Sequence, residues 1–280
     1  RVLVLDSADE PAKKIIISGG GRCNFTNLHA TPKNFFSNNP HFCISALKSY
    51  TQHDFIALVE KHKITYHEKT LGQLFCDHSS HSIVKMLLEE CAAAHVQIEL
   101  QQRVVSISKS DVFSVQTNDG NYQAPALVLA SGGLSIPKMG ASDFAHRLAK
   151  QFGLPLTDIR PALVPLTFSG ELLEFMRPLS GLSTEIIAAQ EKIKFRAGMV
   201  FTHRGMSGPA ILQISSVWRV GRDVTLDMLP DLNAEEFLLE RKAQRPNAEL
   251  KTILAELLSQ RLAQAFTAQF FINVPIGTMT

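Results

Sequence analysis

The sequence predicts an α/β protein built from two domains. Three observations support this expectation: an apolar run closed by an acid at residues 2–6, a triple glycine at residues 19–21, and a change to strand-rich segments after Pro161. At 280 residues the chain is too long for one minimal domain of about 100–150 residues. We therefore expect a first domain over residues 1–160 and a second over residues 161–280.

The bulk composition is typical of a globular protein that works on small molecules. Hydrophobic residues make up 45% and charged residues 19%, and the formal charge is +2 with both signs scattered. Because the charges form no basic stripe, we expect a small-molecule substrate and no nucleic-acid partner. No apolar run reaches the roughly 18 residues that span a bilayer. Cysteine spacing and the absence of a signal-peptide pattern predict no metal and a cytoplasmic location.

The first element, residues 2–6, is typical of a buried parallel strand that ends in an acid. In a dinucleotide-binding βαβ unit such an acid binds the ribose hydroxyls, about 20 residues after a glycine-rich turn. Asp6 has that position, although a plain polar strand end is an equally open interpretation of Asp6 alone. The glycine turn would lie before Arg1, so we expect the first strand, turn and helix of the unit to be missing.

Residues 13–27 are the most informative stretch. Three successive glycines, 19–21, follow an apolar run and allow positive φ and close approach of a ligand to main-chain N–H groups. Arg22 and Asn24 add hydrogen-bonding groups suited to a pyrophosphate or a flavin ring. Cys23 could react with a flavin, but we expect it to pack as a small buried hydrophobe.

Other local patterns predict the remaining elements. In the first domain we expect helices at 42–50, 54–62, 82–95 and 143–152, strands at 96–110, 113–117 and from Tyr122 forming a β-meander, and a parallel strand at 126–130. In the second we expect strands at 162–168, 183–189, 192–202 and 224–228, a helix from Pro209 to Val217, and a helical lobe over 234–270 interrupted near Pro246.

Four islands of sequence, in order along the chain, carry a family resemblance. They are residues 13–27, 72–75, 129–140 and 201–210. The chain resembles the BaiN-like NAD(P)/FAD-dependent oxidoreductases, also described as aminoacetone-oxidase-family enzymes, within the glutathione-reductase-like flavoprotein superfamily. The resemblance implies a Rossmann-like FAD-binding domain with a β-meander, lacking its first strand-turn-helix, and a second β-rich domain with a helical lobe.

The resemblance also implies the cofactor contacts. The implied FAD-binding residues are Asp6, Lys14, Ser18, Gly19, Gly20, Gly21, Arg22, Cys23, Asn24, the backbone of Val104, and Ala130, Ser131, Gly132 and Gly133. For Val104, a role as a core strand residue is equally open. A glycine-rich C-terminal segment of the family is missing after Thr280. We therefore expect this piece, as a fragment, to bind FAD weakly, to be inactive alone and to aggregate.

His203 and Arg204 are the candidates for the substrate side of the site. They lie in a glycine-rich turn before a helix. A histidine can transfer a proton near neutral pH, and an arginine can bind a carboxylate. The alternative is a solvated turn in which Ser207 caps the next helix.

These observations predict an FAD-dependent oxidoreductase acting on a small organic substrate, with NAD(P)H as a candidate electron donor. A flavin-carrying redox-sensing or binding protein without turnover is the alternative. An RNA-associated flavoprotein is a third hypothesis, which the weak net charge disfavours.

Overall fold

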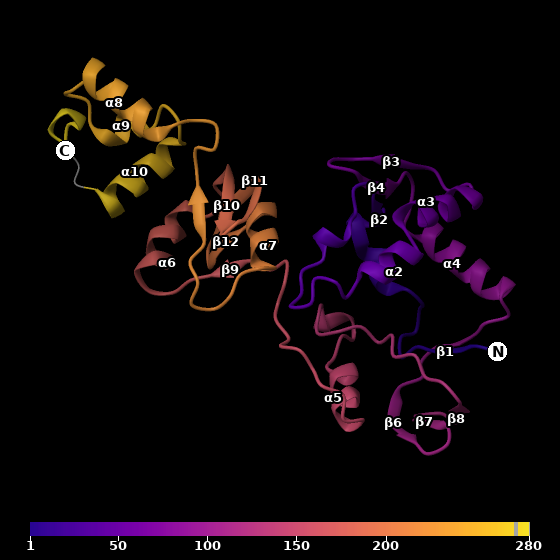
Figure 1. Ribbon diagram of the computed structural model, residues 1–280. Coiled ribbons are helices and arrows are strands. Elements are labelled where there is room, and N and C mark those ends of the chain that lie inside the picture. Colours follow the sequence, from indigo (N-terminus) through magenta and orange to yellow (C-terminus); the bar gives the residue numbers. More distant parts are fainter. Residues whose placement is uncertain (272–273, 280) are drawn as a thin grey trace. The chain divides into compact units, whose positions relative to one another are not determined.

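The computed structural model describes residues 1–271 and 274–279 and divides the chain into two compact units. Unit 1 comprises residues 1–158 and unit 2 residues 159–280. Figure 1 shows a mixture of helices and small sheets in both units, and this architecture agrees with the predicted α/β fold class. Among the described residues, no helix has the length and apolar character needed to cross a membrane.

Unit 1 contains three small sheets. Strand β1 (Leu3–Leu5) pairs in parallel with β5 (Gln97–Glu99). An antiparallel sheet has the order β2-β4-β3, and the predicted meander forms a third sheet of the order β6-β7-β8. These strands are β2 (Asn24–Asn27), β3 (Tyr66–Glu68), β4 (Gln73–Cys76), β6 (Val104–Lys109), β7 (Phe113–Thr117) and β8 (Asn121–Ala124).

The helices of unit 1 follow their sequence signals. They are α1 (Lys13–Ile17), α2 (Ile44–Ser49), α3 (Gln52–Lys61), α4 (His81–Ala93) and α5 (Phe144–Gln151), with 3-10 turns at Ser18–Gly20, Pro32–Asn34 and Pro137–Met139. Thr51 begins α3 with a capping box: its N–H donates to the Asp54 carboxylate at 2.7 Å and its Oγ1 accepts from the Asp54 N–H at 3.3 Å. Helix α4 buries Ile83 and Met86, as its apolar face predicts.

Three predictions for unit 1 are wrong. The expected strand at 96–110 is two strands, because Gln101 takes a positive φ of 58° and the chain turns from β5 to β6. The expected strand at 126–130 is irregular, and Val128 is 86% exposed, because no neighbouring strand supplies ladder hydrogen bonds there. The first strand is parallel as expected but is not buried, since Val2 and Val4 are exposed.

Unit 2 is built on one five-stranded antiparallel sheet of the order β13-β10-β11-β12-β9. Strands β10 (Ser183–Gln190) and β11 (Ile193–Thr202) form a long hairpin in the register Ile186↔Ala197. The other strands are β9 (Leu166–Thr167), β12 (Gly205–Ser207) and β13 (Thr225–Asp227). The expected strand at 162–168 is thus shorter, and β12 was not expected from the sequence.

The helices of unit 2 are α6 (Gly170–Met176), α7 (Pro209–Ser215), α8 (Ala234–Gln244), α9 (Leu250–Leu254) and α10 (Gln260–Phe270), with 3-10 turns at Arg177–Leu179 and Ile276–Thr278. Pro209 opens α7 because proline tolerates the first helical position. The predicted lobe over 234–270 is helical with a break near Pro246, and a second break separates α9 from α10. Figure 1 shows these three helices gathered at the C-terminal end of the chain.

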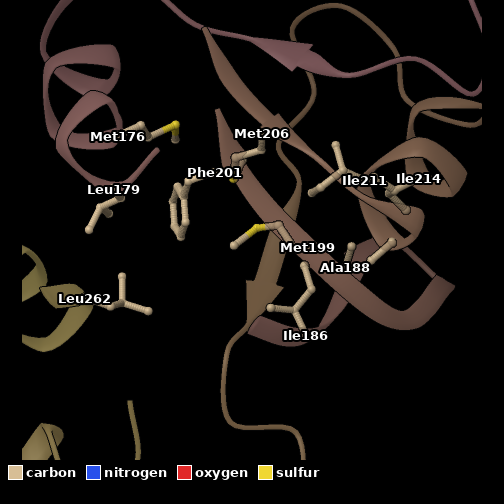
Figure 2. Close-up of a cluster of buried hydrophobic side chains, with 11 residues drawn as sticks. Met176, Leu179, Ile186, Ala188, Met199, Phe201, Met206, Ile211, Ile214 and Leu262 are labelled. Carbon is tan, nitrogen blue, oxygen red and sulfur yellow. The ribbon is translucent and has the colours of Figure 1, made fainter. Parts of the chain in front are cut away.

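The core of unit 2 lies on one face of its sheet. Ile186, Met199 and Phe201 project from β10 and β11 and meet Ile211 and Ile214 of α7. Figure 2 shows Phe201 directed toward Met176 and Leu179, with Leu262 of α10 nearby. The alternating burial along β10 follows from the two-residue period of a strand.

Candidate functional site

We call residues 18–24, which lead from α1 into the first residue of β2, the glycine loop. Backbone hydrogen bonds from the end of β4 and the start of α4 anchor this loop. The Gly21 carbonyl accepts the Ser80 N–H at 2.9 Å, and the Arg22 carbonyl accepts the Cys76 N–H at 2.9 Å. Ser80 is fully buried, and its Oγ donates to the Ile16 carbonyl at 2.7 Å. These bonds hold the loop in one conformation. The sequence offered no signal for Ser80, because its partner lies 64 residues away.

The three glycines of this loop have different roles. All take positive φ, at 58°, 67° and 83° for Gly19, Gly20 and Gly21. A Cβ on Gly19 would lie 2.8 Å from the Asn24 nitrogen and from the Phe75 ring, so packing within the protein requires this glycine. Apart from the adjoining residues, no heavy atom of the described part of the chain lies within 4 Å of a Cβ placed on Gly20 or Gly21. The loop therefore has open space above these two glycines.

The expectation that the three glycines offer their amides to a ligand is wrong for Gly21, and the neighbouring Cys23 amide is engaged in the same way. The N–H groups of Gly21 and Cys23 both donate to the Ser18 carbonyl at 3.0 Å. The Asn24 side chain is also engaged: with its amide turned so that the nitrogen donates, it reaches the Thr26 and Leu74 carbonyls at 3.1 and 3.2 Å. Arg22 is exposed and remains available to an anionic group.

The structure brings Lys14 to the second predicted cofactor segment, residues 130–133, and to Ser135 just beyond it. Lys14 Nζ donates to Ser135 Oγ at 3.0 Å and lies 3.9 Å from a Cβ placed on Gly132, which has a φ of 74°. Ala130, Ser131 and Gly132 are exposed, and Gly133 is half-buried. The lysine thus joins two segments that are more than a hundred residues apart in sequence.

His146 of α5 lies beside this segment and was missed by the sequence analysis. Its Cε1 is 3.9 Å from a Cβ placed on Gly133. Its Nδ1 is buried and has no hydrogen-bond partner in the part of the chain that the structure describes. A buried ring nitrogen without a partner is costly unless a ligand or water completes it.

Asp6 and Val104 already have structural contacts. One Asp6 carboxylate oxygen accepts the Ala8 N–H at 2.9 Å, so it stabilises the turn after β1. The Asp6 N–H donates to the Glu99 carbonyl at 2.9 Å. Val104 begins β6 opposite Thr117 and its side chain packs against the core of the meander. Neither arrangement prevents the proposed ligand contacts.

Cys23 packs in the core, as expected. It is 4% exposed and shares a hydrophobic cluster with Val59, Cys76 and Met86. Burial raises the pKa of the Cys76 thiol to about 11. A thiol with a raised pKa is a poor nucleophile at neutral pH, so Cys76 is suited to packing. No group of three potential metal ligands occurs among the described residues.

His203 and Arg204 belong to unit 2, where they form the two-residue turn between β11 and β12. Both are exposed. The Arg204 N–H donates to Thr202 Oγ1 at 3.3 Å, and the Arg204 carbonyl accepts the Phe168 N–H at 3.1 Å, which fixes the turn. Ser207 does not cap α7, since Gly208 has the N-cap position.

Comparisons with known proteins change the functional expectation. The chain is 48% identical over 266 residues to a ribosomal RNA dihydrouridine synthase of Escherichia coli strain K12, covering 94% of this chain and 66% of the relative. It is 43% identical over 278 residues to the protein of the same name from Haemophilus influenzae, covering 97% and 69%. A 3-dehydro-bile acid delta(4,6)-reductase of Clostridium scindens is 24% identical over 250 residues, covering 84% and 60%. The chain spans about two thirds of the length of the first two relatives.

These names overturn two predictions. A small organic substrate and the absence of a nucleic-acid partner are both wrong for the two relatives above 40% identity, which are named for action on ribosomal RNA. The alternative of a flavin-carrying redox-sensing or binding protein without turnover is not supported either, since the relatives are named as enzymes. The same two relatives are not named as BaiN-like or aminoacetone-oxidase-family enzymes, so only a broader family is supported.

That family is defined by a match over most of the chain. The model described as "HI0933-like protein Rossmann domain" matches residues 1–260, which include the glycine loop and the segment around Ser135. The chain therefore belongs to the HI0933-like Rossmann-domain family.

Proposed function

We propose that the chain is the cofactor-carrying part of a flavin-dependent enzyme that reduces uridine in ribosomal RNA to dihydrouridine. The observation that carries the proposal is the glycine loop, whose carbonyls are anchored by Ser80 and Cys76 while Gly20 and Gly21 leave open space on its other side. The substrate class comes from the two relatives named as ribosomal RNA dihydrouridine synthases.

FAD fits the residues around the loop. A side chain at Gly20 or Gly21 would occupy the open space, so glycine at both positions suits close approach of a pyrophosphate or a flavin edge. Lys14 and the exposed Arg22 supply positive charge for phosphates. The unpartnered Nδ1 of His146 would gain a hydrogen bond from a ligand seated over Gly133.

The reaction needs a hydride and a proton, because dihydrouridine carries two more hydrogens than uridine across one ring double bond. A flavin held by these residues and reduced by NAD(P)H, the proposed electron donor, would supply the hydride. The proposed cofactor contacts are those of the sequence analysis: Asp6, Lys14, residues 18–24, Val104 and residues 130–133. His203 and Arg204 are the proposed substrate-side residues, with the imidazole as the proton donor and the guanidinium as the group that binds an RNA phosphate.

The test uses ribosomal RNA transcribed in vitro, which contains no dihydrouridine. The whole enzyme, of which this chain is the proposed cofactor-carrying part, is incubated with this RNA, FAD and NADPH, and nucleosides from the digested RNA are analysed by mass spectrometry. We expect dihydrouridine to form, together with the visible absorbance of protein-bound flavin. Absence of dihydrouridine with flavin bound would contradict the proposed substrate, and absence of bound flavin would contradict the cofactor.

A matched pair of glycine variants separates the role of the glycine loop in cofactor binding from general backbone strain. Gly20→Ala introduces a Cβ where φ is 67°, and Gly221→Ala does so in unit 2 where φ is 83°; both positions have open space. Each substitution carries a similar backbone strain of about 1–2 kcal/mol. We expect only Gly20→Ala to weaken flavin binding and dihydrouridine formation. Equal effects of the two variants would show that strain alone is responsible.

A further inference from the structure

Residues 31–50, which connect β2 to α3 (Figure 1), carry exposed aromatic side chains. Ten consecutive residues, 33–42, are exposed, and they include three phenylalanines. Phe42 is 80% exposed, Phe35 49% and Phe36 48%, and Tyr50 at the end of α2 is 52% exposed. Four of the six exposed aromatic side chains among the described residues therefore lie in this segment. We call these four side chains, with Lys33 and Lys48, the aromatic–basic surface.

The surface lies in a stretch without acidic residues. No Asp or Glu occurs between Glu10 and Asp54, and the stretch contains five basic residues: Lys13, Lys14, Arg22, Lys33 and Lys48. Its formal charge is thus +5, whereas the whole chain carries +2, so the remainder carries −3. Three histidines, at 29, 41 and 53, lie in the same stretch. A local excess of this size attracts a polyanion although the average charge is small.

The segment is ordered by its own polar side chains. The Thr31 N–H donates to Asn34 Oδ1 at 2.8 Å, closing a capping box at Pro32–Asn34. The N–H of Asn39 donates to Ser37 Oγ at 3.1 Å, and the N–H of His41 donates to Asn39 Oδ1 at 3.1 Å. Because these side chains hold the backbone, the phenylalanines are displayed outward on a turn-rich scaffold. Several exposed large apolar side chains within one short segment are typical of an interaction site.

We propose that the aromatic–basic surface binds unpaired RNA, with bases stacked on the aromatic rings and phosphates held by Lys33 and Lys48. The proposal rests on the proposed function, which makes RNA the substrate. Exposed aromatic rings interleaved with basic residues are the combination that binds single strands with little sequence preference. A second copy of this chain is disfavoured, because it would bring two acid-free surfaces of the same charge together.

Variants at Phe42 separate stacking from simple apolar contact. Binding of a short, fluorescein-labelled oligouridylate to the full chain is measured by fluorescence anisotropy. Phe42→Ala and Phe42→Leu should each weaken binding by about 5- to 100-fold, since a stacked base is worth roughly 1–3 kcal/mol. Phe42→Trp should keep the affinity, because the larger ring retains a stacking face. Val220→Ala, which changes a 90% exposed side chain in unit 2, should have no effect.

Salt dependence tests the lysines. For single strands, each lost phosphate contact lowers the slope of log affinity against log salt by about 0.7. Lys48→Gln should show this change, whereas Lys192→Gln, at an exposed turn position of unit 2, should not. Equal slopes for the two variants would overturn the role of Lys48.

The contrary outcomes identify other occupants. If Phe42→Leu binds RNA as the unsubstituted chain does, the surface makes only apolar contact and stacking is excluded. If sedimentation shows a dimer that Phe42→Ala dissociates while RNA affinity is unchanged, the occupant is a second copy. Neither measurement requires FAD, so failure of the dihydrouridine assay leaves this test intact. Conversely, if the Phe42 variants form dihydrouridine normally and bind RNA with unchanged affinity, the proposed RNA binding by the aromatic–basic surface is wrong, whereas the proposed function stands.

Discussion

Among the described residues, 17 apolar side chains are buried in residues 159–280, but only 12 in the longer residues 1–158. Unit 2 gathers eleven of its buried residues into one cluster on one face of its sheet (Figure 2). Unit 1 divides its buried apolar residues among smaller clusters, and it leaves Val4 and Val128 exposed. Its glycine loop is fixed instead by polar groups, above all Ser80. Apolar packing thus shapes unit 2, whereas buried hydrogen bonds position the candidate site of unit 1.

The largest effect should follow from Ile186→Ala in the core of unit 2. Ile186 is 0% exposed, and removing its methyl groups leaves a cavity that costs about 2–5 kcal/mol. Urea unfolding followed by Trp218 fluorescence reports on unit 2, since the Trp218 indole donates to the Arg222 carbonyl at 2.7 Å. Val220→Ala should change the free energy of unfolding by less than about 0.5 kcal/mol. The contrast between the two units would be wrong if, in Ile186→Ala, the Cys76 thiol of unit 1 became accessible at the same lowered urea concentration at which unit 2 unfolds.

Ser80→Ala should have the next largest effect, and on unit 1 alone. Loss of the Ser80 hydroxyl leaves the Ile16 carbonyl without its 2.7 Å hydrogen bond, which costs roughly 1–3 kcal/mol for a buried group. Labelling of the Cys76 thiol in increasing urea, read by mass spectrometry of the peptide, measures the opening of unit 1. Burial raises the pKa of this thiol to about 11, so it should be protected while folded. Ser45→Ala, on the exposed side of α2, is the control; an equal shift for both variants would contradict the anchoring role.

The sequence predicted elements whose signals are local. The strands predicted at 183–189 and 192–202 match β10 and β11, the helix predicted at 54–62 matches α3, and the helix predicted from Pro209 matches α7. The strand at 126–130 could not be predicted correctly, because an apolar run becomes a strand only where a partner strand offers hydrogen bonds.

The candidate site was predictable in part. The glycine loop is visible as a triplet, whereas Ser80 and His146 act through contacts with residues distant in sequence. The net charge of +2 misled the expectation about nucleic acid, because it averages a positive stretch at residues 11–53 with a negative remainder. Counting the charges in successive short segments of the sequence would have revealed this positive stretch.

Thr51→Ala should produce a smaller change, again in unit 1. It removes the Oγ1 that accepts the Asp54 N–H at 3.3 Å at the start of α3, and losing such a cap costs about 1 kcal/mol. Helix α3 contributes the buried Val59 to the cluster around Cys76, so the urea concentration at which Cys76 becomes labelled should fall. Thr70→Ala, at an exposed turn position, should leave it unchanged. A loss as large as that from Ser80→Ala would contradict the ranking of the two anchors.

The smallest effect should appear as a pH dependence of the same cap. Hydrogen bonds from the Thr51 N–H and hydroxyl lower the pKa of Asp54 below 3.8. Because the folded-state pKa is lower than the unfolded one, the carboxylate contributes stability above pH 3.8, and this contribution is lost as pH falls through the folded value. Asp54→Asn keeps an oxygen acceptor but does not titrate, so unit 1 should lose less stability on acidification. The slope should not vanish, since hydrogen bonds to His67 and Lys61 also lower the pKa values of Asp77 and Glu90. Asp111→Asn, in the exposed turn after β6, should leave the acid slope as it is, and an equal slope for Asp54→Asn would show that the cap acts through geometry without its charge.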